Sequence, residues 1–138
     1  MRFEGRVTKV GRYWAIEVPI LRVATQGRSR KEAFEMIADA IEELVQREGF
    51  EARVFAGRGE YFEVGASDEG ALTALLLRRE RQRAGLTLAQ VAARLGSTSP
   101  NAYARYEQGQ AVPSVSKLSL LLGAVTGSGD FVLAESRA

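Results

Sequence analysis

Three glycines divide the second half of this 138-residue chain into short helices. Gly85, Gly96 and Gly109 each close a helical stretch, and glycine commonly ends a helix because the residue after the last turn often takes a left-handed conformation. Thr87 to Gln90, just after the first glycine, has the spacing of a capping box, which starts a helix. The sequence therefore predicts a helix from Leu72 up to Gly85, followed by two short helices.

The two short helices have the spacing of a helix-turn-helix. Ala92 lies four residues before Gly96. The first helix of this motif needs a small residue where the second crosses closely, and the turn needs a residue that accepts a left-handed conformation. The second helix then protrudes toward the major groove of DNA. Four helices in an ordinary bundle would give a similar pattern, so the spacing alone leaves that interpretation open.

Four further segments are expected in this half. Residues 66–70 are small and polar and predict a linker. Residues 100–108 fit the second short helix. Pro113-Ser114 opens a last helix that continues to Val125, and Phe131 to Leu133 is expected to form a terminal strand.

The first half alternates between apolar and polar residues in its opening segments. Residues 3–10 and 13–18 predict a hairpin around Gly11, and 21–25 predicts a third strand. Ser29 to Glu32 is a capping box that opens a helix over residues 30–48, whose apolar stripe is Phe34, Ile37, Ile41 and Leu44. Two strands, 51–55 and 60–64, follow. The predicted order is β-β-β-α-β-(β), a small sheet with one helix on one face.

A metal site is one interpretation of acidic residues in this half, because nucleases of the ribonuclease H kind bind metal ions through converging carboxylates. The candidates among its 13 acidic residues are Glu4, Glu17, Glu35, Asp39, Glu60 and Glu63. The strand glutamates alternate with the apolar positions, which predicts that they lie on a solvated outer face. We therefore expect no metal site.

Composition excludes several classes of protein. Apolar residues make up 46% of the chain, which is enough for packed cores. The chain has no cysteine and no histidine, so disulfides, thiolate zinc, imidazole ligands and a Ser-His-Asp triad are excluded. We expect no enzyme activity and no cofactor. No apolar run reaches the roughly 18 residues of a membrane span, and no signal stretch is present, so we expect a cytoplasmic protein without membrane contact.

Charge separates the two halves. Residues 1–70 carry 11 Lys and Arg against 13 Asp and Glu, a net charge of −2, whereas residues 71–138 carry eight against four, a net of +4. A polyanion such as DNA would therefore bind the second half.

Five short motifs in the second half resemble a known family. They are Leu86-Thr87, Val91-Ala92, Gly96, Tyr106-Glu107-x-Gly109 and Pro113-Ser114. With them, Leu86 to Val125 resembles the Cro/C1-type (xenobiotic-response-element) helix-turn-helix family. This resemblance implies that Ser99, Asn101 and Arg105 face the groove, where asparagine can bond adenine and arginine can bond guanine.

The other DNA contacts follow from the same geometry. Thr98 is expected to cap the second helix and touch a phosphate, and Tyr103 to reach the DNA backbone or the groove edge. Tyr106 is expected in the core, and Glu107 as a structural hydrogen-bonding residue. The predicted DNA-binding residues are Gln90, Arg94, Thr98, Ser99, Asn101, Tyr103 and Arg105, with Arg79 and Arg83 as further phosphate contacts.

The first half is similar to HicB antitoxins. The shared residues are Thr25-Gln26-Gly27, Glu32-Ala33, Ala40-Ile41 and Phe62-Glu63-Val64, and the run from Asn101 to Gly109 resembles the DNA-binding part of HicB variants with a helix-turn-helix. The resemblance implies an α+β protein. Residues 1–66 would form a partial ribonuclease H-like domain that lacks catalytic carboxylates, and residues 71–138 an all-α helix-turn-helix domain.

The resemblance also implies two partners. The first domain would bind a HicA-like toxin, a small basic protein that cleaves mRNA. The second would bind double-stranded operator DNA as a homo-dimer or higher homo-oligomer and repress its own operon. Two alternatives stay open, a stand-alone transcriptional regulator with an N-terminal sensing or oligomerisation module, and a metal-dependent nuclease that uses Glu4 or Glu17.

Overall fold

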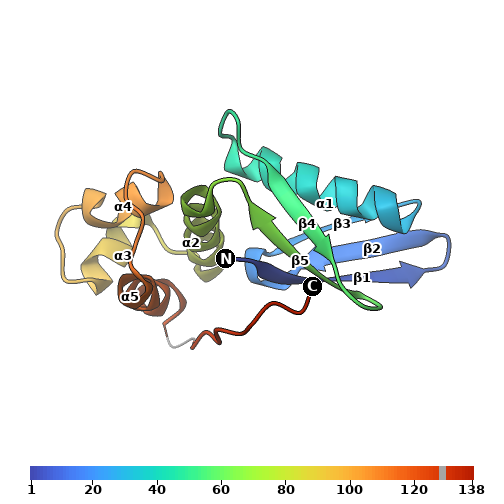
Figure 1. The fold of residues 1–138 in the computed structure, drawn as a ribbon. Helices are drawn as coiled ribbons and strands as arrows, with labels where there is room; N and C mark the ends of the chain where they lie inside the picture. The colour runs from blue at the N-terminus through green and yellow to red at the C-terminus, as the bar shows by residue number, and fades with distance from the viewer. Residues whose placement is uncertain (128–129) are drawn as a thin grey trace. The chain divides into compact units, whose positions relative to one another are not determined.

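The computed structural model describes residues 1–127 and 130–138, which form a mixed α+β protein of two compact units (Figure 1). Unit 1 consists of Met1–Leu72 together with Glu135–Ala138, and unit 2 consists of Thr73–Ala134. The division falls inside one helix, α2 (Glu69–Ala84). The last four residues of the chain therefore belong to the first unit.

Unit 1 is a five-stranded antiparallel sheet with strand order β3-β2-β1-β5-β4. Helix α1 (Arg30–Val45) lies across one face of it (Figure 1). The predicted order of three strands, one helix and two strands is confirmed. The strands are β1 (Phe3–Val10), β2 (Tyr13–Val18), β3 (Val23–Gly27), β4 (Ala52–Ala56) and β5 (Tyr61–Ala66).

The core of unit 1 lies between the sheet and α1. Ile37 and Ile41 of α1 are fully buried, as are Phe62 and Val64 of β5. Close approach requires glycine at one point: a Cβ atom on Gly27 would lie 2.4 Å from the amide nitrogen of Ala33, so α1 could not follow β3 so tightly with any other residue there.

The boundaries differ from the predicted ones where local backbone geometry intervenes. The third strand begins at Val23, because Pro19–Leu21 forms a 3₁₀ turn that Arg22 ends in a left-handed conformation. Helix α1 ends at Val45, since Gln46 turns left-handed and donates its amide to Glu42. Helix α2 begins at Glu69, earlier than the apolar pattern, and Asp68 accepts the amide of Ala71 at 2.9 Å.

The predicted terminal strand at Phe131 to Leu133 is wrong. Residues 130–138 contain no strand or helix, and Val132 and Leu133 are more than 90% exposed. Three apolar residues favour a strand only where another strand offers a hydrogen-bonding edge, and this segment pairs with none.

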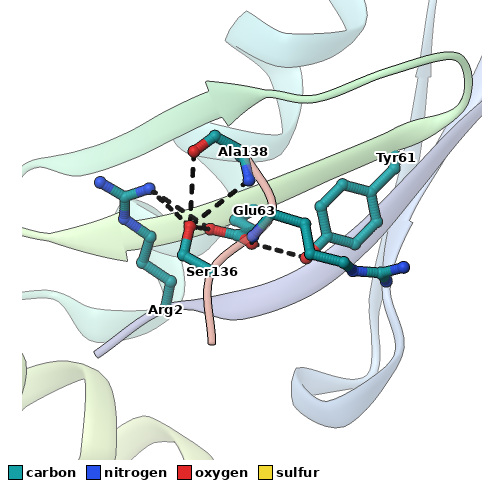
Figure 2. Close-up of polar contacts among 6 residues, drawn as sticks. Arg2, Tyr61, Glu63, Ser136 and Ala138 are labelled. Atoms are coloured by element: carbon teal, nitrogen blue, oxygen red, sulfur yellow. Dashed lines mark hydrogen bonds and ion pairs between the residues drawn. The ribbon is translucent and has the colours of Figure 1, made fainter. Parts of the chain in front are cut away.

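The prediction that all strand glutamates are solvated is wrong for Glu63. Glu63 lies on the sheet face opposite α1, as expected. It is nevertheless only 3% exposed, because the end of the chain covers it (Figure 2). The Glu63 carboxylate accepts hydrogen bonds from Ser136 Oγ at 2.5 Å, the Arg137 amide at 2.7 Å and the Tyr61 hydroxyl at 2.6 Å. Arg2 pairs with it at 3.3 Å.

These contacts set the ionisation of Glu63. Burial alone raises the pKa of the carboxyl, but the hydrogen bonds from Ser136, Tyr61, the Arg137 amide and Arg2 all favour the charged form and lower the pKa to about 2. The Glu63 bond in turn raises the pKa of Tyr61. A buried carboxylate is thus kept charged by donors that come from both ends of the chain.

Unit 1 should therefore lose stability in acid. Because the folded-state pKa of Glu63 is lower than the ordinary 4.5, the carboxylate stabilises the fold above that pH and the stabilisation declines as the pH falls toward 2. We expect the free energy of unfolding to decrease by up to about 3 kcal/mol across that interval. Trp14, on β2, reports unfolding of unit 1 by fluorescence in denaturant titrations.

The Glu63→Gln variant should be less stable at neutral pH and should show a flatter pH dependence below 4.5. Glu17→Gln, on the same sheet and exposed, is the matched control and should retain the wild-type profile. Equal pH dependence of the free energy of unfolding in wild type and Glu63→Gln would contradict the stabilising role of the Glu63 carboxylate.

Candidate nucleic-acid interface

Unit 2 contains most of α2, from Thr73 to Ala84, and the helices α3 (Leu88–Arg94), α4 (Asn101–Glu107) and α5 (Val115–Thr126). The lengths agree with the glycine-delimited segments of the sequence. Buried side chains come from each helix, including Leu76, Leu77, Val91, Ala92, Tyr103, Tyr106, Leu121 and Val125. Ala92, the small residue expected at the helix crossing, is 1% exposed.

The turn after α3 is closed by Gly96. Its φ is +79°, a left-handed conformation that favours glycine, and a pair of backbone bonds surrounds it. Ser97 donates to the Ala92 carbonyl at 2.9 Å and Gly96 to the Ala93 carbonyl at 3.0 Å, which is the Schellman pattern. The same pair of bonds ends α2 around Gly85 and α4 around Gly109. One local motif therefore sets all three helix ends.

The start of α3 is fixed by the predicted capping box. Thr87 Oγ1 accepts the Gln90 amide at 3.1 Å, and Gln90 Oε1 accepts the Thr87 amide at 2.8 Å. The prediction of this box from four residues is confirmed. Gln90 is exposed while its Oε1 holds the cap.

A buried ion pair joins α2 to the far end of α4. Arg81 Nε and Nη2 donate to the two carboxylate oxygens of Glu107 at 2.7 and 2.9 Å, and the side chains are 17% and 6% exposed. Arg81 Nη1 also donates to the Leu86 carbonyl at 2.9 Å. The prediction that Glu107 is a structural hydrogen-bonding residue is confirmed, and so is the burial of Tyr106.

Two of the predicted base-reading residues share the exposed face of α4. Asn101 and Arg105 are four residues apart, which places them one above the other on a helix surface, and both are exposed. The Arg105 guanidinium lies 5.0 Å from the centroid of the Tyr106 ring, and Nη2 donates to its hydroxyl at 3.3 Å. Tyr106 thus positions Arg105 without covering it. Ser99, also exposed, lies two residues before this helix, ahead of its N-cap Pro100.

Tyr103 is wrong as a predicted DNA contact, and Thr98 is wrong as the predicted cap of α4. Tyr103 is fully buried, its hydroxyl donates to the Leu77 carbonyl at 3.4 Å, and burial raises its pKa. Two residues along a helix turn by about 200°, so Tyr103 lies opposite Asn101 and Arg105. Thr98 does not cap α4, because the helix begins after Pro100 without a side-chain cap and Ser97 Oγ instead accepts the Ser99 amide at 3.2 Å. Thr98 itself is exposed.

The arginines expected to meet phosphates have different surroundings. Arg94, at the end of α3, is exposed and donates to the Ala124 carbonyl at 3.0 Å. Arg83 pairs with the buried Glu80 at 3.3 Å. Sequence reasoning missed Lys117, which lies 5.9 Å from the Tyr106 ring in the first turn of α5. Its position beside α4 arises from packing between helices, for which the sequence has no local signal.

Among residues 1–127 and 130–138, no group of three or more acidic side chains is placed to hold a metal ion. Within the same residues, no helix is long and apolar enough to cross a membrane.

Residues 74–129 match the family model described as a helix-turn-helix domain. The matched range covers α2 from its second turn through α5, including the capping box, the Schellman turn and the exposed face of α4. A domain of this class indicates a DNA-binding regulator. No curated protein matches the chain.

The Arg81–Glu107 pair should be essential to the fold of this domain. Arg81→Ala leaves a buried carboxylate uncompensated, so we expect a loss of about 3 kcal/mol in the free energy of unfolding, measured by circular dichroism in denaturant. Gln82→Ala, one residue away and exposed, should change it by less than about 0.5 kcal/mol. A double-mutant cycle with Glu107→Ala that gave no coupling energy would contradict the role of the pair.

Proposed function

We propose that this chain is an operator-binding repressor that reads DNA with α4 and is also an antitoxin of the HicB kind. The observation that carries the DNA part is the exposed Asn101–Arg105 face within the helix-turn-helix domain. Asparagine and arginine are the side chains that recognise adenine and guanine edges bidentately. Ser99, Thr98, Gln90 and Arg94 flank that face as phosphate or sugar contacts.

Charge supports the assignment of DNA to unit 2. Thr73–Ala134 carries seven Lys and Arg against three Asp and Glu, a net of +4. Arg81 faces Glu107, whereas Arg94 and Arg105 present their charge at an exposed surface. Binding should therefore weaken steeply as salt increases, because neutralising phosphates releases counterions.

The antitoxin part rests on unit 1. The element order β1-β2-β3-α1 supports the partial ribonuclease H-like comparison, and Gly27 of the Thr-Gln-Gly segment lies in close contact with the start of α1. Unit 1 is acidic, with a net charge of −2, which suits a small basic HicA-like toxin. In this proposal unit 1 blocks the toxin by binding and has no catalytic activity of its own.

A homo-dimer is proposed for operator binding. A groove of about 860 Å³ lies along α3 and α5, between Arg94, Ser116 and Leu120, and the Leu120 side chain is 57% exposed. An exposed leucine beside a groove fits a second copy of the same surface. The half-sites would then lie about one helical turn, roughly 34 Å, or a multiple of it apart.

A stand-alone regulator is the second candidate. The segment before Thr25-Gln26-Gly27 forms a 3₁₀ turn in which Leu21 is fully buried and Arg22 is left-handed. Leu21 therefore packs in the core of unit 1, whereas Pro19 and Arg22 of the same segment are exposed. In the second candidate, unit 1 senses a ligand or assembles copies.

The DNA proposal predicts specific losses. Asn101→Ala and Arg105→Ala should each weaken binding to the DNA upstream of the chain's own coding sequence by about 1–3 kcal/mol, measured by fluorescence anisotropy. Arg12→Ala, which removes an equal charge from the β1–β2 turn, is the control and should bind as wild type. Wild-type affinity in both α4 variants would contradict the recognition surface.

The antitoxin proposal predicts a partner. Tagged full-length chain should retain a small basic protein from lysate of the native host, at a stoichiometry read by native mass spectrometry. The retained protein alone should cleave mRNA, and an equimolar amount of this chain should stop the cleavage. A chain that binds its promoter but retains no such protein would favour the stand-alone regulator.

A further inference from the structure

The last residues of the chain are seated on unit 1 as a bound peptide would be. Ser136 and the Arg137 amide fill acceptor positions on Glu63, a carboxylate that is 3% exposed (Figure 2). Residues 130–138 contain no helix or strand, so side chains and single amides hold this end rather than a ladder of backbone bonds.

The Arg137 side chain contacts Tyr61 and Glu4. The Arg137 guanidinium lies 4.2 Å from the centroid of the Tyr61 ring, and its Nη2 donates to Glu4 at 3.3 Å. Stacking on an aromatic face next to a carboxylate is a typical way to recognise a guanidinium. Tyr61 also donates to Glu63, so one residue holds the site in shape and contacts the bound arginine.

The Ser136 hydroxyl contacts Arg2 on the other side of Glu63. Arg2 Nη1 donates to Ser136 Oγ at 3.2 Å, and the Arg2 guanidinium is stacked 3.4 Å from the centroid of the Phe55 ring. Arg2, Glu63, Tyr61 and Glu4 therefore form two adjoining subsites, one for a hydroxyl and one for a guanidinium. All four residues lie in or beside the neighbouring strands β1 and β5.

We propose that this face of unit 1 is a binding site for an extended Ser-Arg peptide segment, and that Ser136–Arg137 occupies it in cis as a releasable latch. The identity of the competing segment rests on the proposed function: an arginine-bearing segment of the basic toxin displaces the latch and takes the same place. The toxin thus has to compete with the end of the chain before it can use this face.

The latch is held by contacts that can be broken without unfolding the sheet. The Arg137 side chain and Glu4 are both well exposed, at 65% and 50%, and an exposed ion pair contributes little. Its occupancy depends on the high local concentration of a tethered segment. A protein that brings its own arginine and a larger interface can therefore replace it.

The test uses the full chain and a fluorescent peptide with the sequence of residues 133–138. The Ser136→Ala/Arg137→Ala variant, called the vacated chain, loses the Ser136 hydroxyl and the Arg137 guanidinium and keeps only the backbone amide of residue 137 as a donor to Glu63. The peptide should therefore bind it about tenfold or more tightly than it binds wild type, in which both side chains occupy the site. A peptide with alanine in place of its serine and arginine should lose this binding. Addition of Glu63→Gln to the vacated chain should abolish it, and Glu4→Gln should weaken it if Glu63→Gln does not fold.

Equal affinity of the peptide for wild type and the vacated chain, or no binding to the vacated chain, would overturn the latch. Glu17→Gln in the vacated chain is the matched control, because Glu17 lies on the same sheet in β2, and it should leave peptide binding unchanged. The peptide assay requires no toxin, so it can succeed when the antitoxin proposal fails. A toxin that binds the vacated chain without displacing the peptide would support the antitoxin proposal and overturn the latch as its regulator.

Discussion

The Arg81–Glu107 ion pair is the contact on which the DNA-binding surface depends. Arg81 holds Glu107 at the end of α4 through two nitrogens and the Leu86 carbonyl through the third, while its own carbonyl accepts the Leu86 amide. One residue therefore ties together the end of α2, the approach to α3 and the end of α4. Since α4 has only seven residues, its direction depends on such contacts more than on its own helical stability.

Each unit contains a buried carboxylate that several hydrogen-bond donors satisfy. Glu107 in unit 2 and Glu63 in unit 1 are both removed from water, and each is satisfied by several donors. Within the described part of the chain, no buried side-chain nitrogen or oxygen lacks a hydrogen-bond partner. The difference lies in the donors. Glu107 receives an arginine from a helix, whereas two donors of Glu63 belong to a chain end without secondary structure, which is why only the latter contact can serve as a latch.

Local rules predicted most of the fold. The capping box at Thr87, the Ser29 cap and the glycines at 85, 96 and 109 act through bonds within five residues and appear as predicted, except that the Glu32 side chain accepts the amide of Arg28 and not that of Ser29. Tyr103 could have been placed correctly as well, because helical periodicity alone puts it opposite Asn101.

What the sequence could not predict are pairs that join distant segments. Arg81 and Glu107 are 26 residues apart, and Ser136 and Glu63 are 73 apart. An exposed glutamate and a buried one have the same alternation along β5, so only the knowledge that the chain end returns to this face distinguishes them. The fold of unit 1 is in this respect incomplete in its first 72 residues, and its outer face is defined only when the last four are included.

The two units carry net charges of opposite sign, −2 for unit 1 and +4 for unit 2, and this affects how the proposed functions can be separated. Binding of DNA to the basic unit and the proposed binding of a basic protein to the acidic one would both weaken with salt, so salt dependence alone does not identify the surface in use. Position does. Substitutions at Asn101 or Arg105 lie in the DNA-binding unit, whereas those at Glu4, Glu63 or Arg137 lie in the sheet unit. A variant that changes one activity and leaves the other intact therefore assigns that activity to its unit, whichever partner the sheet proves to bind.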